Sequence, residues 1–212
     1  VEGLGEDRDA TKLSKQEIRD IVREAGIVGL GGAGFPTNVK LTPKDESKID
    51  YVIVNGAECE PYLTCDYRMM IEEPERLVGG LKVMLQLFEN AKAVIGIENN
   101  KPKAIETLRA LVKDEPKITV EPLRTKYPQG GERSLIYAVT GREINSSMLP
   151  ADAGCVVDNV NTVMAIYDAV CKQTPILERV ITVTGDAVKE PQNFKVRTGM
   201  NYNDIIEAAG GF

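Results

Sequence analysis

The chain has 212 residues, of which 42% are hydrophobic, and its 26 basic and 32 acidic side chains give a formal net charge of -6. This length can hold one sizeable α/β domain and a smaller unit, and no basic run is long enough to predict nucleic acid as a partner. The sequence contains no histidine, which excludes Ser-His and Cys-His nucleophilic mechanisms and imidazole metal ligands.

Two further absences bear on membranes and metals. No apolar run reaches the roughly 20 residues that a spanning helix needs, so we expect no direct membrane insertion. The four cysteines, Cys59, Cys65, Cys155 and Cys171, show neither a C-x-x-C pair nor the compact spacing of an iron–sulfur ligand run. We therefore expect free thiols in a reducing cytosol and no metal site. Because no signal-like segment opens the sequence, we expect a trimmed region of a cytosolic protein.

A glycine-rich stretch follows the first predicted helix. That helix begins at the capping box of Ser14 and Glu17 and ends near Gly26. Residues 29–36, here called the glycine loop, then place four glycines in six positions before Phe-Pro. Glycines this dense suit a backbone that exposes amides to an anion, so we predict a phosphate cradle with Lys40 as its counter-charge. The alternative is a connector without a ligand.

The glycine loop also matches the G-x-G-x-x-G pattern of dinucleotide-binding proteins. That pattern is informative only where the glycines leave a strand and enter a helix. Here a helix precedes them and Pro36 follows closely. We therefore do not expect a Rossmann dinucleotide turn.

A short apolar run at residues 51–54 predicts a buried parallel strand. It leads into a polar turn that contains Asn55, Glu58 and Glu60. Since α/β folds bind ligands at the carboxyl ends of parallel strands, these side chains are candidates for contact with a ribityl chain, a ribose or a nicotinamide amide. A solvated acidic turn is the alternative.

The centre of the chain alternates between predicted helices and strands. A helix from Pro74 carries an apolar stripe that places Met84 and Phe88 in the core. A strand at residues 93–97, a helix at 102–113 and a strand at 118–120 follow. This order predicts an α/β fold, a Rossmann-like layered domain with a mainly parallel sheet.

Two later loops also carry candidate ligand groups. Gly130 and Gly131 precede a helix at residues 134–140 and should leave unpaired amides, with Glu132 in the first turn. A capped helix start is the alternative. Further on, Asp158, Asn159 and Thr162 follow a short apolar run and could bind a phosphate or a pyrimidine edge, although Asp158 or Asn161 could instead cap the next helix.

The composition changes near residue 175. Strands at 180–184 and 194–197 and a helix at 203–209 are predicted beyond it. These roughly 34 residues are too few for a core of their own, so we expect the start of a second, truncated domain. The predicted domains are residues 1–178 and 179–212.

Four separate segments together resemble a known family. They are Gly-Leu-Gly-Gly-Ala-Gly-Phe-Pro-Thr-Asn-Val-Lys at 29–40, Asn-Gly-Ala-Glu-Cys-Glu-Pro at 55–61, Tyr-Pro-Gln-Gly-Gly-Glu at 127–132 and Val-Asp-Asn-Val-Asn-Thr at 157–162. In this order they closely resemble RnfC, the C subunit of Rnf ion-translocating electron transport complexes. They resemble the flavin subunit of respiratory complex I more distantly. The resemblance implies that residues 179–212 open a β-grasp (SLBB) domain after the flavin domain.

The resemblance implies an FMN site, and because no Thr or Ser flavin attachment motif is evident, we predict noncovalent binding. By match of motif the cofactor contacts are Gly29, Gly31, Gly32, Lys40, Asn55, Glu58, Gly130, Gly131, Asp158, Asn159 and Thr162. The last three would bind the phosphate end, Lys40 would lie beside the flavin, and Asn55 and Glu58 would contact the flavin or its ribityl chain. Glu60 and Glu132 match acidic positions near bound NADH and are the implied catalytic residues.

The implied reaction is hydride transfer between NADH and the flavin, followed by one-electron transfer to iron–sulfur clusters. The 4Fe-4S clusters would lie in a C-terminal region missing from this chain. The partners would be other Rnf subunits, on the cytoplasmic side of the cell membrane, with this subunit peripheral. The alternatives are an RnfC-like cobalamin reductase and a non-catalytic interaction scaffold that has kept the fold without the flavin.

This sequence departs from the complex I pattern at several positions. Leu30 replaces an arginine, Gly131 replaces one of two paired glutamates, and residues 41–43 replace aromatic side chains. These departures weaken the prediction of a nicotinamide site more than that of a flavin site.

Overall fold

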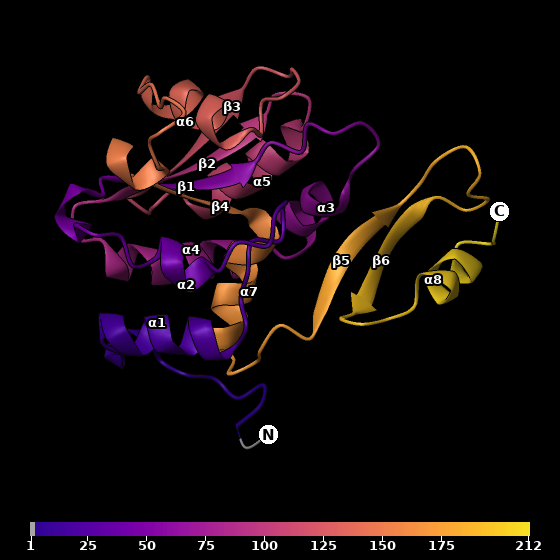
Figure 1. Cartoon of the computed structure of the whole chain (residues 1–212), viewed down its shortest axis with the longest axis horizontal. Coiled ribbons are helices and arrows are strands. Elements are labelled where there is room, and N and C mark those ends of the chain that lie inside the picture. The colour runs from indigo at the N-terminus through magenta and orange to yellow at the C-terminus, as the bar shows by residue number, and fades with distance from the viewer. Residues whose placement is uncertain (1–2) are drawn as a thin grey trace.

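A four-stranded parallel sheet forms the centre of the protein in the computed structural model, which describes residues 3–212 (Figure 1). The strand order is β3-β2-β1-β4. The strands are β1 (Tyr51–Gly56), β2 (Lys92–Glu98), β3 (Ile118–Leu123) and β4 (Cys155–Asn159). All three pairings are parallel, which confirms the predicted Rossmann-like layered α/β fold.

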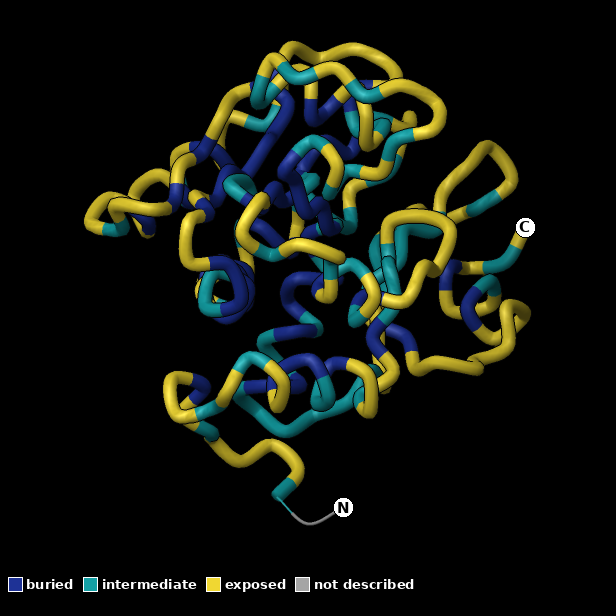
Figure 2. Tube along the Cα trace, turned by 60° about the vertical axis from the view of Figure 1, so that its left-hand side comes forward, coloured by how far each residue is buried: buried dark blue, intermediate teal, exposed yellow. Residues whose placement is uncertain are grey.

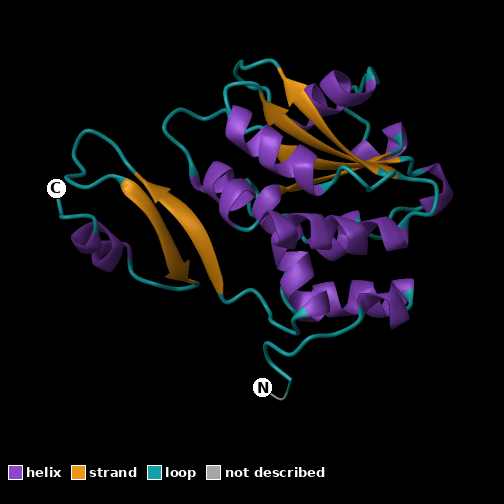
Figure 3. Cartoon of the chain, turned by 180° about the vertical axis from the view of Figure 1, so that it is seen from behind, coloured by secondary structure: helices purple, strands orange, loops and turns teal. Residues whose placement is uncertain are grey.

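Helices cover both faces of this sheet. They are α1 (Lys15–Glu24), α2 (Thr37–Lys40), α3 (Cys65–Glu72), α4 (Pro74–Leu87), α5 (Pro102–Leu111), α6 (Glu132–Thr140) and α7 (Val160–Cys171), with short 3-10 turns η1 (Ala10–Lys12), η2 (Glu46–Lys48) and η3 (Pro150–Ala153). Helices α4, α5 and α7 pack on one face and α6 on the other (Figures 1 and 3). Helix α1 packs on α7 in a further layer.

Alternating side chains of the strands build two cores, because successive residues of a strand point to opposite faces. In β1, Val52 and Val54 join the large core under α4, α5 and α7, whereas Ile53 joins the smaller core under α6. Met84 and Phe88 are buried as predicted. Figure 2 shows this buried centre and the exposed loops around it.

Local signals set most helix starts. Ser14 and Glu17 form the predicted capping box of α1, and Gly26 follows that helix with a φ of 70°. Pro74 occupies the first turn of α4. Helix α3 was not predicted; its first amides are capped by Glu58 and Thr182 and not by its own N-cap residue, Thr64.

The C-terminal residues form a separate layer beside α3 (Figure 3). Strands β5 (Glu178–Val183) and β6 (Gln192–Arg197) pair as an antiparallel hairpin, followed by α8 (Tyr202–Ala208). These are the predicted elements. The division into residues 1–178 and 179–212 stays a prediction. No helix in residues 3–212 has both the length and the apolar character needed to cross a bilayer.

Candidate functional site

The carboxyl edge of the sheet between β1 and β4 is a topological switch point. From β1 the chain proceeds outward through β2 to β3, and then returns to place β4 on the other side of β1. Connections therefore diverge between these two strands, which is where open α/β sheets bind ligands. Asn55 at the end of β1 lies directly opposite Asn159 at the end of β4.

The glycine loop closes on itself and rests on the start of α7. Val28 pairs with Pro36, and the amide of Gly29 donates to the carbonyl of Phe35 over 2.8 Å. The amide of Leu30 donates to Thr162 Oγ1 over 2.9 Å. In the described chain the element before the loop is helix α1 and not a strand. The prediction that the loop is not a Rossmann dinucleotide turn is therefore confirmed.

Gly31 must be glycine for a steric reason. A Cβ atom there would lie 2.9 Å from both Cβ and Nδ2 of Asn159. Gly32 has nothing within 4 Å of a Cβ. The loop therefore lies against the N-terminal turn of α7 at Gly31 and opens outward at Gly32, where the positive end of the helix dipole favours an anion.

The tip of the glycine loop carries backbone donors without protein acceptors. Residues 31–36 are exposed. Within residues 3–212, no hydrogen bond is formed by the amides of Gly31, Gly32 or Ala33. Neighbouring free amides on a positive helix end form the kind of surface that binds phosphate.

Lys40 lies between two carboxylates beside the loop. Its Nζ donates to the carbonyl oxygen of Val157 over 2.7 Å. It also lies 3.5 Å from Oδ1 of Asp158 and 3.5 Å from Oε1 of Glu132. The side chain of Lys40 remains 26% exposed and that of Glu132 42% exposed, so both can reach a ligand.

Asp158 lies behind Lys40 and not on the open surface. Its side chain is fully buried, and within the described chain no group donates a hydrogen bond to either carboxylate oxygen. Burial raises the pKa of Asp158 to about 6, while the charge of Lys40 opposes that shift. Direct contact between Asp158 and a phosphate, as the sequence predicted, does not fit this position; the residue instead adjusts the charge around Lys40.

Thr162 and Asn159 form hydrogen bonds within the protein. Thr162 is fully buried and accepts the amide of Leu30. Asn159 accepts the amide of Asn161 and thereby caps α7, and its Nδ2 donates to Asp66 over 2.7 Å. The cap of α7 is therefore Asn159, and not Asp158 or Asn161. These two residues shape the glycine loop in this structure, and direct contact with phosphate stays a proposal.

Asn55 connects the turn after β1 to the loop before α6. Its Nδ2 donates to the carbonyl of Gly130 over 2.7 Å, and its Oδ1 accepts the amide of Ala57. A Cβ on Gly130 would lie 2.5 Å from the carbonyl oxygen of Ala57, so the two loops pack tightly. The amides of Gly130 and Gly131 donate to Cys59 Sγ and to the carbonyl of Pro128. The predicted unpaired amides at these glycines are therefore wrong.

Glu58 and Glu60 have different surroundings despite their proximity in sequence. Glu58 is 7% exposed, and its carboxylate accepts the amides of Asp66 (2.9 Å) and Tyr67 (3.3 Å) at the start of α3. Burial raises its pKa, and the nearby charge of Asp66 adds to the effect. Glu60 is exposed. Glu58 thus caps a helix, and Glu60 is free to face a substrate.

Three side chains in this region lie close enough to share a metal ion. The candidate ligand atoms of Glu58, Cys65 and Asp66 lie within 4.8 Å of one another. Both carboxylates already accept hydrogen bonds, Glu58 from α3 and Asp66 from Asn159 and Asn161. Their position is explained by this network without a metal.

Family comparison identifies the fold of the site. The model of the Nuo51 FMN-binding domain matches residues 22–168, and that of the SLBB domain matches residues 180–212. The chain belongs to the Nuo51 FMN-binding domain family.

Curated relatives agree with this assignment. The C subunit of a proton-translocating ferredoxin:NAD(+) oxidoreductase complex from Clostridium ljungdahlii is 50% identical over 212 residues, which are 100% of this chain and 46% of the relative. The C subunit of an Na(+)-translocating complex of the same kind from Acetobacterium woodii is 46% identical over 210 residues, 99% of this chain and 46% of the relative. These relatives confirm the resemblance to RnfC, and the chain spans a little under half of their length.

A solved structure supports the fold. The NAD+-reducing NiFe-hydrogenase in its air-oxidized state aligns with a TM-score of 0.76 at 24% identity, over 96% of this chain and 40% of that chain. At this identity the likeness shows the fold alone.

The donor set of the site fits the FMN of this family. A phosphate needs several converging donors, and the free amides of the glycine loop supply them beside the N-terminus of α7. Lys40 adds a positive charge, and it forms an ion pair with the buried carboxylate of Asp158. The residues present are therefore suited to a phosphorylated cofactor.

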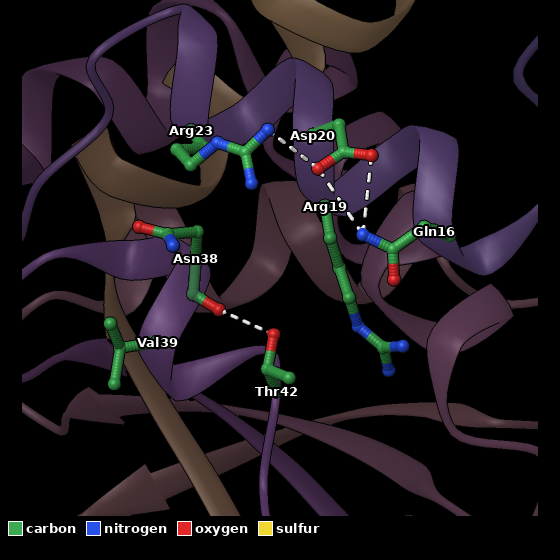
Figure 4. Close-up of a pocket in the computed structure, with 7 residues that line it drawn as sticks. All are labelled: Gln16, Arg19, Asp20, Arg23, Asn38, Val39 and Thr42. Atoms are coloured by element: carbon green, nitrogen blue, oxygen red, sulfur yellow. Dashed lines mark hydrogen bonds and ion pairs between the residues drawn. The ribbon is translucent and has the colours of Figure 1, made fainter.

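Two hollows lie elsewhere on the molecule. One of about 380 Å³ lies between α1 and α2 and is shown in Figure 4; its lining residues are Gln16, Arg19, Asp20, Arg23, Asn38, Val39 and Thr42. The other, of about 390 Å³, lies between α3 and the hairpin. Neither is lined by Lys40 or by the glycine loop.

Sequence reasoning missed three residues that build the site. Asp66 links Asn159 to Asn161. Thr182 Oγ1 accepts the amides of Thr64 and Cys65, and Arg179 donates to the carbonyl of Leu30. Their partners lie far away in sequence, so no local pattern points to them.

Proposed function

We propose that this chain is the flavin-binding, electron-input part of an Rnf-type complex, which holds FMN noncovalently and exchanges electrons with NAD(H). The observation that carries the proposal is the row of free amides at the tip of the glycine loop, which lies against the start of α7 at the switch point of the sheet. Support also comes from the family and from the ferredoxin:NAD(+) oxidoreductase complexes named for its relatives.

Each part of the site would have a separate task. The amides of Gly31 and Gly32 would bind the phosphate, and Asn55, Gly130 and Gly131 would line the cofactor pocket. Four residues would support these loops through the hydrogen bonds and the ion pair described above: Glu58, Asp158, Asn159 and Thr162. Bound FMN would supply hydride exchange with NADH and one-electron transfer to iron–sulfur clusters outside this chain.

Lys40 and two acidic residues would control the electrostatics beside the cofactor. The ammonium of Lys40 is offset by Asp158 and Glu132, each 3.5 Å away. Glu132 and Glu60 are exposed and would face the nicotinamide side. The partners would be the other subunits of the complex, at the cytoplasmic side of the membrane.

A scaffold without flavin is the second candidate, and one observation favours it. The polar side chains of Asn55, Glu58, Asn159 and Thr162 are satisfied inside the protein. The fold therefore does not need a cofactor to satisfy them. This candidate predicts that FMN does not bind.

A titration with FMN, followed by flavin fluorescence, distinguishes the two. We expect saturable binding that Lys40→Met weakens about tenfold or more, because a charged partner of the cofactor is lost. The matched control is Lys44→Met, which removes the same charge from an exposed position nearby. Absence of binding by the folded chain, or equal weakening by both variants, would contradict the proposed site.

A further inference from the structure

The peptide bond between Leu30 and Gly31 is held from outside the flavin domain. Arg179, near the start of β5, donates from Nη2 to the carbonyl oxygen of Leu30 over 3.0 Å. On the other side of the same residue, the amide of Leu30 donates to Thr162 Oγ1 over 2.9 Å. Both peptide planes that flank Leu30 are therefore fixed by side chains distant in sequence.

This bond determines where the next amide points. A trans peptide is planar, and its C=O and N–H point in opposite directions. The carbonyl of Leu30 belongs to the same peptide as the N–H of Gly31. With the carbonyl held by Arg179, the N–H of Gly31 is turned away from the hairpin. The positive guanidinium also polarises this peptide, which strengthens its N–H as a donor.

The hairpin is itself anchored to the flavin domain, so that Arg179 has a defined position. Thr182 Oγ1 accepts the amides of Thr64 and Cys65, each over 3.1 Å, and Asn193 contacts Thr64 Oγ1. Before the hairpin, the amide of Ile176 donates to the carbonyl of Ala25 at the end of α1. These contacts lie on both sides of Arg179 in sequence.

We propose that Arg179 is a positioning residue for the phosphate site: through the Leu30 carbonyl it orients the Gly31 amide, and so makes the geometry of the glycine loop depend on the SLBB hairpin. This inference rests on the proposed function for its effect on FMN. Its effect on the loop itself holds with or without the cofactor.

The test compares Arg179→Met and Arg179→Lys with the control Arg197→Met in the full chain. Arg197 is an exposed arginine of β6, so its replacement removes the same charge from the same hairpin. Exchange of the Gly29 and Leu30 amides is measured by NMR without FMN, and FMN and riboflavin are then titrated. Thermal melting shows that each variant is folded.

For Arg179→Met we expect the exchange of the Leu30 amide to rise about fivefold and FMN to bind about fivefold to tenfold more weakly. Riboflavin binding should stay unchanged, because the Gly31 amide serves the phosphate. Arg179→Lys keeps a charged donor and should recover part of the FMN affinity, while Arg197→Met should resemble the parent chain.

The outcomes separate this inference from the proposed function. If the parent chain does not bind FMN, the proposed function fails and amide exchange alone decides the role of Arg179. Unchanged exchange at Gly29 and Leu30 in Arg179→Met would overturn the inference, as would equal effects of Arg179→Met and Arg197→Met. Equal losses of FMN and riboflavin would also overturn it, since they would indicate a general disturbance of the fold.

Discussion

Two groups of backbone amides lie near the carboxyl edge of the sheet, and the protein treats them differently. At the start of α3, the amides of Thr64 and Cys65 donate to Thr182, and those of Asp66 and Tyr67 donate to Glu58. At the tip of the glycine loop, no residue in the described chain accepts from the amides of residues 31–33.

The difference follows from burial and side-chain chemistry. The start of α3 lies against the hairpin and is half-buried at residues 65–67, and the first amides of a helix have no partner within it, so the side chains of Thr182 and Glu58 supply the acceptors. The glycine loop is exposed, and its glycines have no side chain that could fold back onto the amides. The paired amides at the start of α3 stabilise the fold, whereas the unpaired amides of the glycine loop are available to an anion.

Gly31→Ala should have the largest effect on the unpaired amides of the glycine loop. The added Cβ would lie 2.9 Å from Asn159, so the loop must move away from α7. We expect FMN affinity to fall about 100-fold, or about 3 kcal/mol, in a fluorescence titration. Gly32→Ala is the control, since its Cβ meets nothing within 4 Å. Equal affinities for the two variants would show that loop position does not matter.

Asp158→Asn should change how stability depends on pH. The folded-state pKa of Asp158 is raised from 3.8 to about 6, so between these values the native state binds the extra proton and the free energy of unfolding falls as pH rises. The variant lacks this contribution. In urea unfolding, we expect the free energy of unfolding of the variant, taken relative to that of the parent, to be about 2 to 3 kcal/mol higher at pH 7 than at pH 4.

The ionisable side chains close to Asp158, Lys40 and Glu132, are present in both proteins, so the difference between the two curves isolates Asp158. Parallel curves for parent and variant between pH 4 and 7 would refute the assignment of a raised pKa.

Glu58→Ala should leave two amides at the start of α3 without their acceptor. It removes a buried carboxylate that accepts two amides at the half-buried start of α3, and we expect the free energy of unfolding to fall by about 2 kcal/mol. Urea unfolding measures this loss. Glu60→Ala, at an exposed neighbouring position, should change stability by less than about 0.5 kcal/mol. A loss as small for Glu58→Ala would mean that the cap is not stabilising.

Thr182→Val should have the smallest effect. The substitution keeps the shape of the side chain but removes the oxygen that accepts the amides of Thr64 and Cys65. We expect a loss of about 1 kcal/mol, together with faster hydrogen exchange at the start of α3. Thr184→Val, at an exposed site just beyond the strand, is the control. Unchanged exchange in α3 would show that the hairpin does not cap it.

Much of the fold could be predicted because its signals are local. The capping box of α1, the proline that begins α4 and the apolar runs of β1 and β2 each lie within a few residues. The same holds for the position of the site, since glycines and polar residues after strands mark the edge of the sheet.

The roles of individual site residues could not be predicted in the same way. Thr162 and Leu30 are 132 positions apart, and Arg179 and Leu30 are 149 apart. Whether Glu58 faces a ligand or caps α3 depends on how the turn after β1 folds back onto that helix, although its partners are only 8 and 9 positions away. The amides of Gly130 and Gly131 were expected to be unpaired, but Gly130 donates to Cys59 Sγ, 71 positions away, and Gly131 donates to the carbonyl of Pro128 in its own turn.

The central claim, that the open amides of the glycine loop hold a phosphate, is tested most directly by comparing the affinities of the parent chain for FMN and riboflavin. These ligands differ only by the phosphate. We predict that FMN binds at least about 100-fold more tightly, because several charge-assisted hydrogen bonds are made only by FMN. Equal affinities for the two ligands, or no binding of either, would contradict the account.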